Sequence, residues 1–334
     1  MGLLVIGAGK WGRNHIRTLD EMDELAGVCD SDLTSIDRLG FLLKENTFIY
    51  NDYENALNHK GIEGVVIATP VDSHLPIAKH ALLKDLPVLI EKPAASSLEE
   101  FKTFLNMPRG IIDSYMYVKA KNLLMSGHLT VYGPAFRSLL TALNQDGSSI
   151  RSIHATRTQI GSWRDEGALY SLGVHDVAMM EVLLGSGLEE VKWDTVTTVA
   201  PFSEESCDCS VNTVGVVEGL TITGEWSFLS PGNRRDFVVT TQKAVYQLNE
   251  KNPWGVSFYP FQSEWPPELF KSPGKIVSEM KEHKVFSDGE AQPLKVELEH
   301  FLTRIRNGGE FRTGLHHTLA VMKAIDKIEK GVKG

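Results

Sequence analysis

Short apolar runs alternate with helix-like patterns over the first 128 residues of the chain. The runs have the length and the aliphatic content of buried strands, and the segments between them have the spacing of helices. Such alternation predicts a parallel sheet covered by helices on both faces. The expected strands are 3–6, 25–29, 65–69, 88–90 and 123–125, the expected helices are 11–20, 32–44, 52–59, 73–84 and 97–106, and 107–121 looks like an insertion.

The pattern changes beyond about residue 130, where β-rich runs become frequent. Two of these runs, 211–217 and 220–228, are joined at Glu218-Gly219 and predict a hairpin. The pattern in the second half of the chain therefore predicts an α+β domain built on a large, mainly antiparallel sheet. Its other expected elements are a strand at 150–160 and helices at 134–145, 166–184, 294–306 and 315–330.

The length of 334 residues fits two domains, since a domain has about 150 residues on average. We place the first, a doubly wound α/β domain, at 1–128 and the second at 129–334. The last helices either stay with the second domain or pack back on the first.

The charge balance argues against a nucleic acid or an anionic membrane as the partner. The chain has 34 Lys and Arg residues against 43 Asp and Glu residues, a net charge of −9, whereas both partners bind basic patches. Its three cysteines predict neither a disulfide framework nor a metal site. It opens on an apolar strand without a leader pattern, and no apolar run approaches the roughly 18 residues that span a bilayer. We expect a soluble, cytoplasmic protein that binds a small molecule and no metal.

A glycine-rich turn, Gly7-Ala8-Gly9-Lys10-Trp11-Gly12, follows the first expected strand. A glycine string is weak evidence alone, but here a strand precedes it, a helix follows it and Asp30 ends the next strand. This is the pattern of a Rossmann dinucleotide site, in which Gly9 lets the backbone approach the pyrophosphate. Asp30 favours NAD over NADP because a carboxylate accepts the ribose hydroxyls and repels a 2′-phosphate. The alternative is a glycine turn without a ligand.

Two further segments lie at the carboxyl ends of expected strands, where ligands bind in doubly wound sheets. The first contains Thr69, Pro70 and His74, and its alternative interpretation is a plain strand-to-helix turn with Ser73 as the N-cap. The second is Glu91-Lys92-Pro93. We expect both segments to contact the cofactor.

Lys92 and His175 are the candidate catalytic residues. An ammonium beside a hydroxyl and a positive nicotinamide has a lowered pKa and can share a proton with the reacting oxygen. Imidazole suits proton transfer near neutral pH, and Ser171, four residues before His175, is expected on the same helix face. The alternatives are a solvated lysine and a histidine satisfied within the core.

With these motifs the sequence resembles the glucose-fructose oxidoreductase, inositol dehydrogenase and MocA-like family (Gfo/Idh/MocA). The glycine turn, Ala68-Thr69-Pro70, Glu91-Lys92-Pro93 and Gly173-Val174-His175-Asp176 occur in the family's order and spacing. The resemblance implies a Rossmann domain followed by an antiparallel-sheet domain whose open face makes a homodimer or homotetramer. It also implies that Lys92 contacts the nicotinamide ribose and the reacting hydroxyl, with His175 as proton acceptor or donor.

The chain departs from the family at Ser171, where many members carry an aspartate. A narrower resemblance favours activity without that aspartate, because a branch that often has serine here oxidises the 3-hydroxyl of UDP-N-acetylglucosaminuronic acid for surface-polysaccharide synthesis. The chain differs from this branch at Gly133, Gln159 and Ser162. The segments that carry the resemblance are Gly127-His128, Tyr132-Gly133-Pro134-Ala135, 157–161, Arg164-Asp165-Glu166 and 293–302.

The expected substrate-binding residues are Tyr132, Arg157, Arg164, Ser171 and His175. The two arginines can clamp a carboxylate or a phosphate, since a guanidinium binds either group through two hydrogen bonds; alternatively they are surface residues at a strand edge. The sequence thus predicts an NAD-dependent dehydrogenase, with C3 of a UDP-N-acetyl-hexosaminuronate as the first hypothesis for the reacting carbon. The alternatives are a free polyol or sugar dehydrogenase, of the inositol or glucose type, and a non-catalytic NAD-binding regulator.

Overall fold

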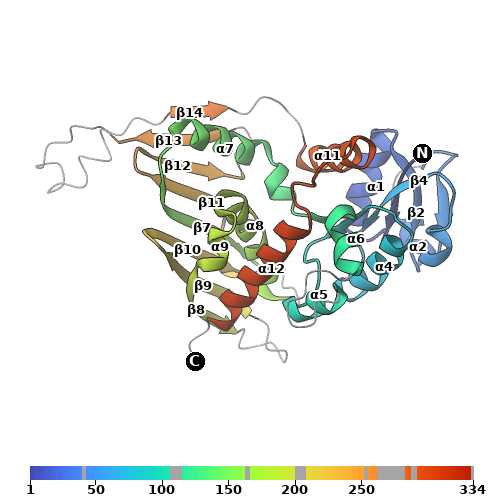
Figure 1. The fold of residues 1–334 in the computed structure, drawn as a ribbon, viewed down its shortest axis with the longest axis horizontal. Coiled ribbons are helices and arrows are strands. Elements are labelled where there is room, and N and C mark those ends of the chain that lie inside the picture. Colours follow the sequence, from blue (N-terminus) through green and yellow to red (C-terminus); the bar gives the residue numbers. More distant parts are fainter. Residues whose placement is uncertain are drawn as a thin grey trace, which may run out of the picture. The chain divides into compact units, whose positions relative to one another are not determined.

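The computed structural model describes residues 1–39, 43–105, 115–161, 166–199, 208–251, 255–261, 283–286 and 292–331. The chain divides into two compact units, each built on its own sheet (Figure 1). The first unit comprises Met1–Leu129 and Gln292–Lys323, and the second comprises Thr130–Ala291 and Ala324–Gly334. No helix within the described ranges is long and apolar enough to cross a membrane.

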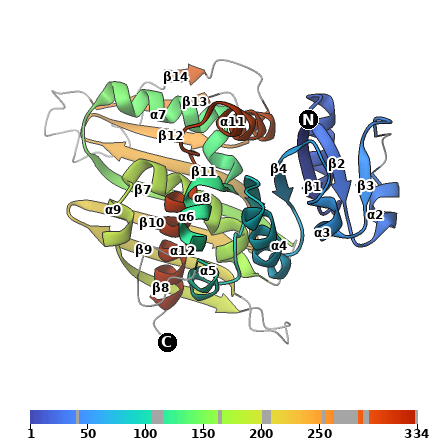
Figure 2. The same cartoon turned by 45° about the vertical axis from the view of Figure 1, so that its right-hand side comes forward.

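The sheet of the first unit has six parallel strands in the order β3-β2-β1-β4-β5-β6. Figure 2 shows β3 at one edge of this sheet, beside β2. This order, which reverses between β1 and β4, is that of the Rossmann fold and confirms the predicted α/β class. The strands are β1 (Gly2–Ile6), β2 (Leu25–Cys29), β3 (Phe48–Tyr50), β4 (Ile62–Ile67), β5 (Val88–Glu91) and β6 (Leu124–Gly127).

The central strands of this sheet are apolar because helices cover them. All five residues of β1 and all four of β5 are buried, and both strands contribute to a hydrophobic cluster with residues of α4, α5 and α6. The helices of this unit are α1 (Gly12–Glu21), α2 (Leu33–Asp37), α3 (Tyr53–Ala56), α4 (Val71–Leu83), α5 (Leu98–Phe104), α6 (Tyr115–Leu123), α11 (Pro293–Asn307) and the start of α12 (Leu315–Lys330).

Three local expectations for this unit are wrong. β3 was not expected, since three partly exposed residues at a sheet edge form no apolar run. α6 occupies part of the segment taken as an insertion, and its exposed Tyr115 and Val118 obscure the helical period. α2 ends at Asp37, whereas a helix up to residue 44 was expected.

The second unit contains an eight-stranded sheet in the order β14-β13-β12-β11-β7-β10-β9-β8. Its neighbours are antiparallel except β7 and β10, which confirms a mainly antiparallel sheet. The expected hairpin is formed by β9 and β10, with Val217 paired to Leu220. The strands are β7 (Ile150–Ile160), β8 (Lys192–Val199), β9 (Asp208–Val217), β10 (Leu220–Ser227), β11 (Leu229–Thr241), β12 (Ala244–Asn249), β13 (Gly255–Pro260) and β14 (His283–Phe286).

One face of this second sheet is covered by helical segments. On that face Trp226, Arg157 and Arg235 are direct neighbours in a row across β10, β7 and β11. A π-helical turn, Leu169–Gly173, and α8 (Val174–Leu184) contact it. Gly173 fits closely there, since a Cβ atom on it would lie 2.8 Å from the Trp226 ring. The remaining helices are α7 (Pro134–Asp146), which lies over β12 and β13 (Figure 1), and α9 (Gly187–Glu190).

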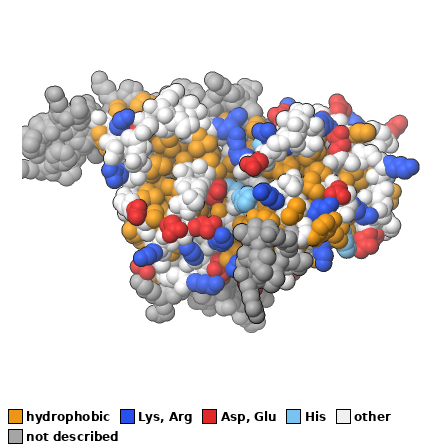
Figure 3. Space-filling view, in the orientation of Figure 1, with side chains coloured by type: hydrophobic (Ala, Val, Ile, Leu, Met, Phe, Trp, Pro, Cys, Tyr) orange, Lys and Arg blue, Asp and Glu red, His pale blue; other side chains and the backbone are white. Residues whose placement is uncertain are grey.

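The other face of the second sheet carries a hollow of about 590 Å³ whose lining includes His154, Asp194 and Glu225. Val196 and Val214 line the same hollow and are 65% and 46% exposed. Elsewhere, on the face of the molecule seen in Figure 3, Lys and Arg side chains are interspersed with Asp and Glu side chains.

Candidate functional site

The turn between β1 and α1 has the backbone of a dinucleotide-binding loop. Gly7 has a φ of 98°, a left-handed conformation that favours glycine. A Cβ atom on Gly12 would lie 1.8 Å from the carbonyl oxygen of Gly7, so the close approach of helix and turn excludes a side chain. A Cβ atom on Gly9 would meet nothing within 4 Å. The space in front of Gly9 is therefore open to a ligand.

Asp30 is held beside this turn by two backbone hydrogen bonds. Its Oδ2 accepts from the N–H of Ala8 at 2.7 Å, and its Oδ1 accepts from the N–H of Asp32 at 2.9 Å. The side chain is partly exposed, and each carboxylate oxygen has capacity for another hydrogen bond. Lys10 and Trp11 are exposed on the turn, and no side chain caps the N-terminus of α1. The first helical N–H groups therefore remain suited to an anion.

The segment after β4 connects the turn region to the Glu91-Lys92-Pro93 segment. Pro70 is the N-cap of α4, so the assignment of Ser73 as the cap is wrong; the Ser73 hydroxyl instead contacts the Pro70 carbonyl and Thr69 Oγ1, both at 2.8 Å. His74 is buried, with Nε2 2.8 Å from the carbonyl oxygen of Thr69 and Nδ1 3.0 Å from that of Pro93. Burial lowers the pKa of His74. The ring thus links the end of β4 to the backbone that follows Lys92.

Glu91 anchors the backbone of Lys92 to α1. Its Oε1 lies 2.6 Å from Nε2 of His15, and its Oε2 accepts from the N–H of Lys92 at 3.2 Å. Both Glu91 and His15 are buried. The sequence did not point to His15, because a histidine on an amphipathic helix has no local pattern that marks a distant carboxylate partner.

Lys92 lies near a pair of buried histidines. His128 Nδ1 is 2.8 Å from His317 Nε2. Burial, His317 and then Lys92 lower the pKa of His128 well below its usual range, so this ring is neutral near pH 7. A separation of 189 residues conceals this pair from sequence reasoning.

A second buried carboxyl group lies close enough to Glu91 to respond to its charge. Glu297 on α11 is fully buried, and neither of its carboxyl oxygens has a hydrogen-bond partner among the described residues. Burial, and then the charge of Glu91, raise the pKa of Glu297 well above its usual range. Both effects favour the neutral form of Glu297, which avoids a second buried negative charge beside Glu91.

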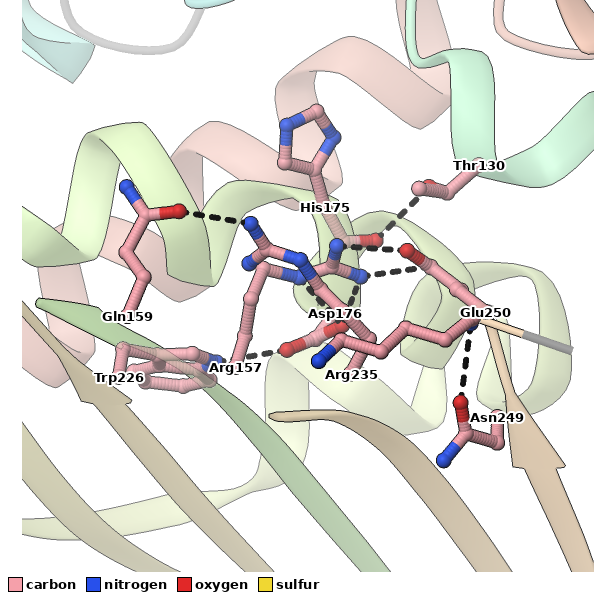
Figure 4. A network of polar contacts seen from close by, with 10 residues as sticks. Thr130, Arg157, Gln159, His175, Asp176, Trp226, Arg235, Asn249 and Glu250 are labelled. Atoms are coloured by element: carbon pink, nitrogen blue, oxygen red, sulfur yellow. Dashed lines mark hydrogen bonds and ion pairs between the residues drawn. The ribbon is translucent and has the colours of Figure 1, made fainter. Parts of the chain in front are cut away.

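In the second unit, His175 lies in the first turn of α8, beside a buried aspartate. Thr130 Oγ1 donates to the backbone carbonyl of His175 at 3.1 Å. The next residue, Asp176, accepts from Trp226 Nε1 at 2.8 Å and from Arg157 Nη2 at 2.7 Å. Figure 4 shows the ring of His175 projecting from the helix turn that holds Asp176. These contacts fix the start of α8 on the sheet and thereby orient His175.

Arg157 lies between two carboxylates of the protein itself. Its Nε and Nη2 donate to Asp176 at 3.2 and 2.7 Å, and its Nη1 and Nη2 donate to Glu250 at 2.7 and 2.6 Å (Figure 4). Burial alone would lower the pKa of Arg157, but Asp176 and Glu250 outweigh burial and raise it. This environment favours a positioning role over direct contact with a substrate. The predicted substrate contact of Arg157 stays a prediction.

The other predicted substrate residues have different positions. Tyr132 is buried at the end of a short helical turn, Leu129–Tyr132. Ser171 is buried, and it lies in the π-helical turn that precedes α8 rather than in a regular α-helix. The expected shared helix face of Ser171 and His175 stays a prediction. Arg164 lies outside the described residues. Within the described part of the chain, no group of three or more His, Cys, Asp and Glu side chains is placed to hold a metal ion.

Residues 1–109 match the family model GFO_IDH_MocA, described as an oxidoreductase family with an NAD-binding Rossmann fold. The matched segment contains the glycine turn, Asp30 and Glu91-Lys92-Pro93. The match covers residues 1–109 of the 334, so this segment is similar to the NAD-binding part of that family. The resemblance seen in the sequence is thereby confirmed for this domain.

A curated relative and two solved structures are similar to this chain beyond the matched segment. Inositol 2-dehydrogenase from Salmonella typhimurium is 24% identical over 206 residues, which are 56% of this chain and 56% of that protein. The chain thus matches little more than half the length of this curated relative. UDP-N-acetylglucosamine 3-dehydrogenase GnnA from Acidithiobacillus ferrooxidans has a TM-score of 0.76 at 19% identity, with 99% of this chain and 97% of that chain covered. Levoglucosan dehydrogenase, solved with NADH and levoglucosan, has a TM-score of 0.79 at 18% identity, with 99% and 96% covered. At these identities the two structures establish a shared fold.

Proposed function

We propose that this chain is an NAD-dependent dehydrogenase that oxidises a secondary hydroxyl of a sugar or a sugar nucleotide. The observation that carries the proposal lies in the first unit, where Asp30 is tied to the glycine turn and Lys92 follows the carboxyl end of another strand of the same parallel sheet, β5. One edge of the sheet thus supplies two groups that NAD needs. Asp30 provides a carboxylate that accepts from the adenosine ribose, and Lys92 provides an ammonium group for the nicotinamide end. The NAD-binding family match supports the same function.

The residues of the glycine turn fit a dinucleotide. Gly9 leaves open space, and α1 has no side-chain cap. The pyrophosphate would lie against the turn and the N-terminus of α1, with Lys10 and Trp11 beside it, and Asp30 would accept the ribose hydroxyls of NAD. We assign Thr69, Pro70 and Glu91 to contacts at the nicotinamide end of the cofactor. His74 stabilises this region because its ring contacts the backbone of Thr69 and of Pro93.

Proton transfer is assigned to Lys92 and His175. A bound NAD supplies the hydride acceptor. His175 takes the proton of the substrate hydroxyl, and Lys92 shares its proton with the same oxygen, a contribution typically worth ~10²–10⁴-fold in rate. Asp176, Arg157 and Glu250 orient His175 through the contacts at the start of α8. Because His128 is neutral, it adds no second positive charge beside the Lys92 ammonium group.

The substrate that we propose first is a UDP-N-acetyl-hexosaminuronate that is oxidised at C3, as in surface-polysaccharide synthesis. The second candidate is a free polyol, which the likeness to inositol 2-dehydrogenase favours. NADH formation with UDP-N-acetylglucosaminuronate, UDP-N-acetylglucosamine, inositol and glucose separates the two. If none of the four is oxidised when NAD is saturating, the dehydrogenase proposal fails and a regulatory role takes its place.

A homo-oligomer formed through the face of the second sheet that carries the hollow belongs to the same proposal. The exposed Val196 and Val214 give that face an apolar component, and such surfaces often bind protein partners. Sedimentation of the wild-type chain and of Val214→Lys gives the test. A monomeric wild-type chain, or an unchanged oligomer in the variant, contradicts the assignment of this face.

A further inference from the structure

The covered face of the second sheet contains an arginine that the network around Asp176 does not use. Arg235 on β11 lies directly opposite Arg157 on β7. The carboxylates of Asp176 and Glu250 both accept from Arg157, and Asp176 also accepts from Trp226. The guanidinium of Arg235 instead donates to a neutral side chain, since its Nη2 lies 2.8 Å from Oε1 of Gln159.

The guanidinium of Arg235 has an unmet hydrogen bond. Its Nη1 is shielded from water and has no partner among the described residues. Burial, and then Arg157, lower the pKa of Arg235, and the charges of Glu250 and Asp176 offset this only in part. Buried N–H groups of folded proteins are nearly always satisfied, by protein, water or a ligand. The residue as a whole is partly exposed, so part of the side chain is in contact with solvent.

Gln159 presents a second donor next to Arg235. A guanidinium has no acceptor, so the Gln159 amide must turn its oxygen toward Arg235. Its NH₂ group is then directed away from the arginine, as Figure 4 shows. The pair therefore offers N–H groups and one positive charge, which suits an oxygen anion.

We propose that Arg235 and Gln159 form a binding site for an anionic group of the substrate, either a carboxylate or a phosphate. The inference rests on the proposed function, because it takes the bound anion to be part of the molecule that is oxidised. In this proposal Arg235 binds the anion, and Arg157 on the neighbouring strand does not. The guanidinium of Arg157 is already hydrogen-bonded to Asp176 and Glu250. Arg157 then acts as a positioning residue for His175.

The test uses three probes and a matched control. Dissociation constants are measured by calorimetry for UDP-N-acetylglucosaminuronate, for UDP-N-acetylglucosamine, which lacks the carboxylate, and for glucuronate, which lacks the nucleotide. The variants are Arg235→Gln and Gln159→Ala, with Arg234→Gln as the control. Arg234 is the adjacent residue of the same strand and is exposed, in ion pairs with Glu225 and Asp236.

If the anion is a carboxylate, we expect Arg235→Gln to weaken both uronates by about 10- to 100-fold, in line with the strength of a charged hydrogen bond, and to leave UDP-N-acetylglucosamine unchanged. If the anion is a phosphate, both UDP-sugars weaken equally and glucuronate binding does not change. Gln159→Ala should weaken binding of the same probes by a smaller factor. Arg234→Gln should leave the affinity for all three probes unchanged. Arg235→Lys, which keeps the charge, replaces Arg235→Gln if that variant does not fold.

Two results overturn the inference. One is unchanged affinity for every probe in Arg235→Gln; the other is a wild-type chain that binds none of the three probes. Either result is compatible with the proposed dehydrogenase function if the chain oxidises inositol or glucose. Conversely, Arg235-dependent binding without oxidation of any sugar would contradict the proposed function and keep the anion site.

Discussion

The Nε2 atom of His15 lies 2.6 Å from the Oε1 atom of Glu91, and both side chains are buried. Removal of one member of a buried pair leaves the other without compensation, which typically costs about 3–5 kcal/mol. We predict that His15→Ala lowers the free energy of unfolding by roughly 3 kcal/mol and weakens NAD binding, because Glu91 also holds the N–H of Lys92. Urea unfolding and NAD titration measure the two effects.

The control for this prediction is Lys330→Ala, which removes an exposed ion pair with Asp326. Exposed pairs of this kind contribute about 0.5 kcal/mol or less. Equal losses of stability in His15→Ala and Lys330→Ala would mean that the contact between His15 and Glu91 does not stabilise the first unit.

Asp30 is predicted to select the cofactor through its charge. Asp30→Asn keeps an oxygen that can accept from the N–H of Ala8 but removes the negative charge that repels a 2′-phosphate. We expect NAD to bind roughly 10-fold more weakly and NADP more tightly, equivalent to about 1.4 kcal/mol for each tenfold change. Titration of both cofactors measures this. An unchanged ratio of the two dissociation constants would show that Asp30 does not select the cofactor.

Asp208 is predicted to make the protein less stable as the pH rises from about 4 to 6. Burial raises the pKa of Asp208 from 3.8 to about 6, even though the N–H of Leu169 donates to it. Between these values the folded chain keeps a proton that the unfolded chain has lost, so the free energy of unfolding falls with rising pH, by up to about 3 kcal/mol.

Unfolding of wild type and Asp208→Asn across this pH range measures the effect. The variant should lack the fall, because it has no ionisable group at this position. The exposed Asp37→Asn serves as the control and should follow the wild type. A parallel fall in Asp208→Asn and wild type would assign the pH dependence to other groups.

The sequence was sufficient for features that a local pattern encodes. Five strands of the first sheet were expected from apolar runs, and Gly7 and Gly12 prove to occupy positions where a side chain would be strained or would clash. It was not sufficient where function depends on distant contacts. Arg157 meets Glu250, 93 residues away, and no spacing indicates that this carboxylate occupies its guanidinium.

Buried ionisable groups were equally difficult to predict from the sequence. Glu297 lies on an amphipathic helix, where a glutamate normally faces solvent, yet it is fully buried. Ser171 illustrates a different limit, since the sequence around it does not indicate that the helix begins with a π-helical turn. The chain is π-helical at Ser171, and tertiary packing of Gly173 against Trp226 accompanies this change.

The most direct test of the account is NADH formation by wild type and Lys92→Ala, measured with the best substrate of the four-sugar screen and combined with NAD titration. We predict that Lys92→Ala lowers turnover by ~10²–10⁴-fold, the usual contribution of acid–base help, while NAD binding changes by only a few-fold. Lys102→Ala, a lysine on the following helix that pairs with Glu99, should retain wild-type turnover. Wild-type turnover in Lys92→Ala would contradict the assignment of catalysis to this lysine.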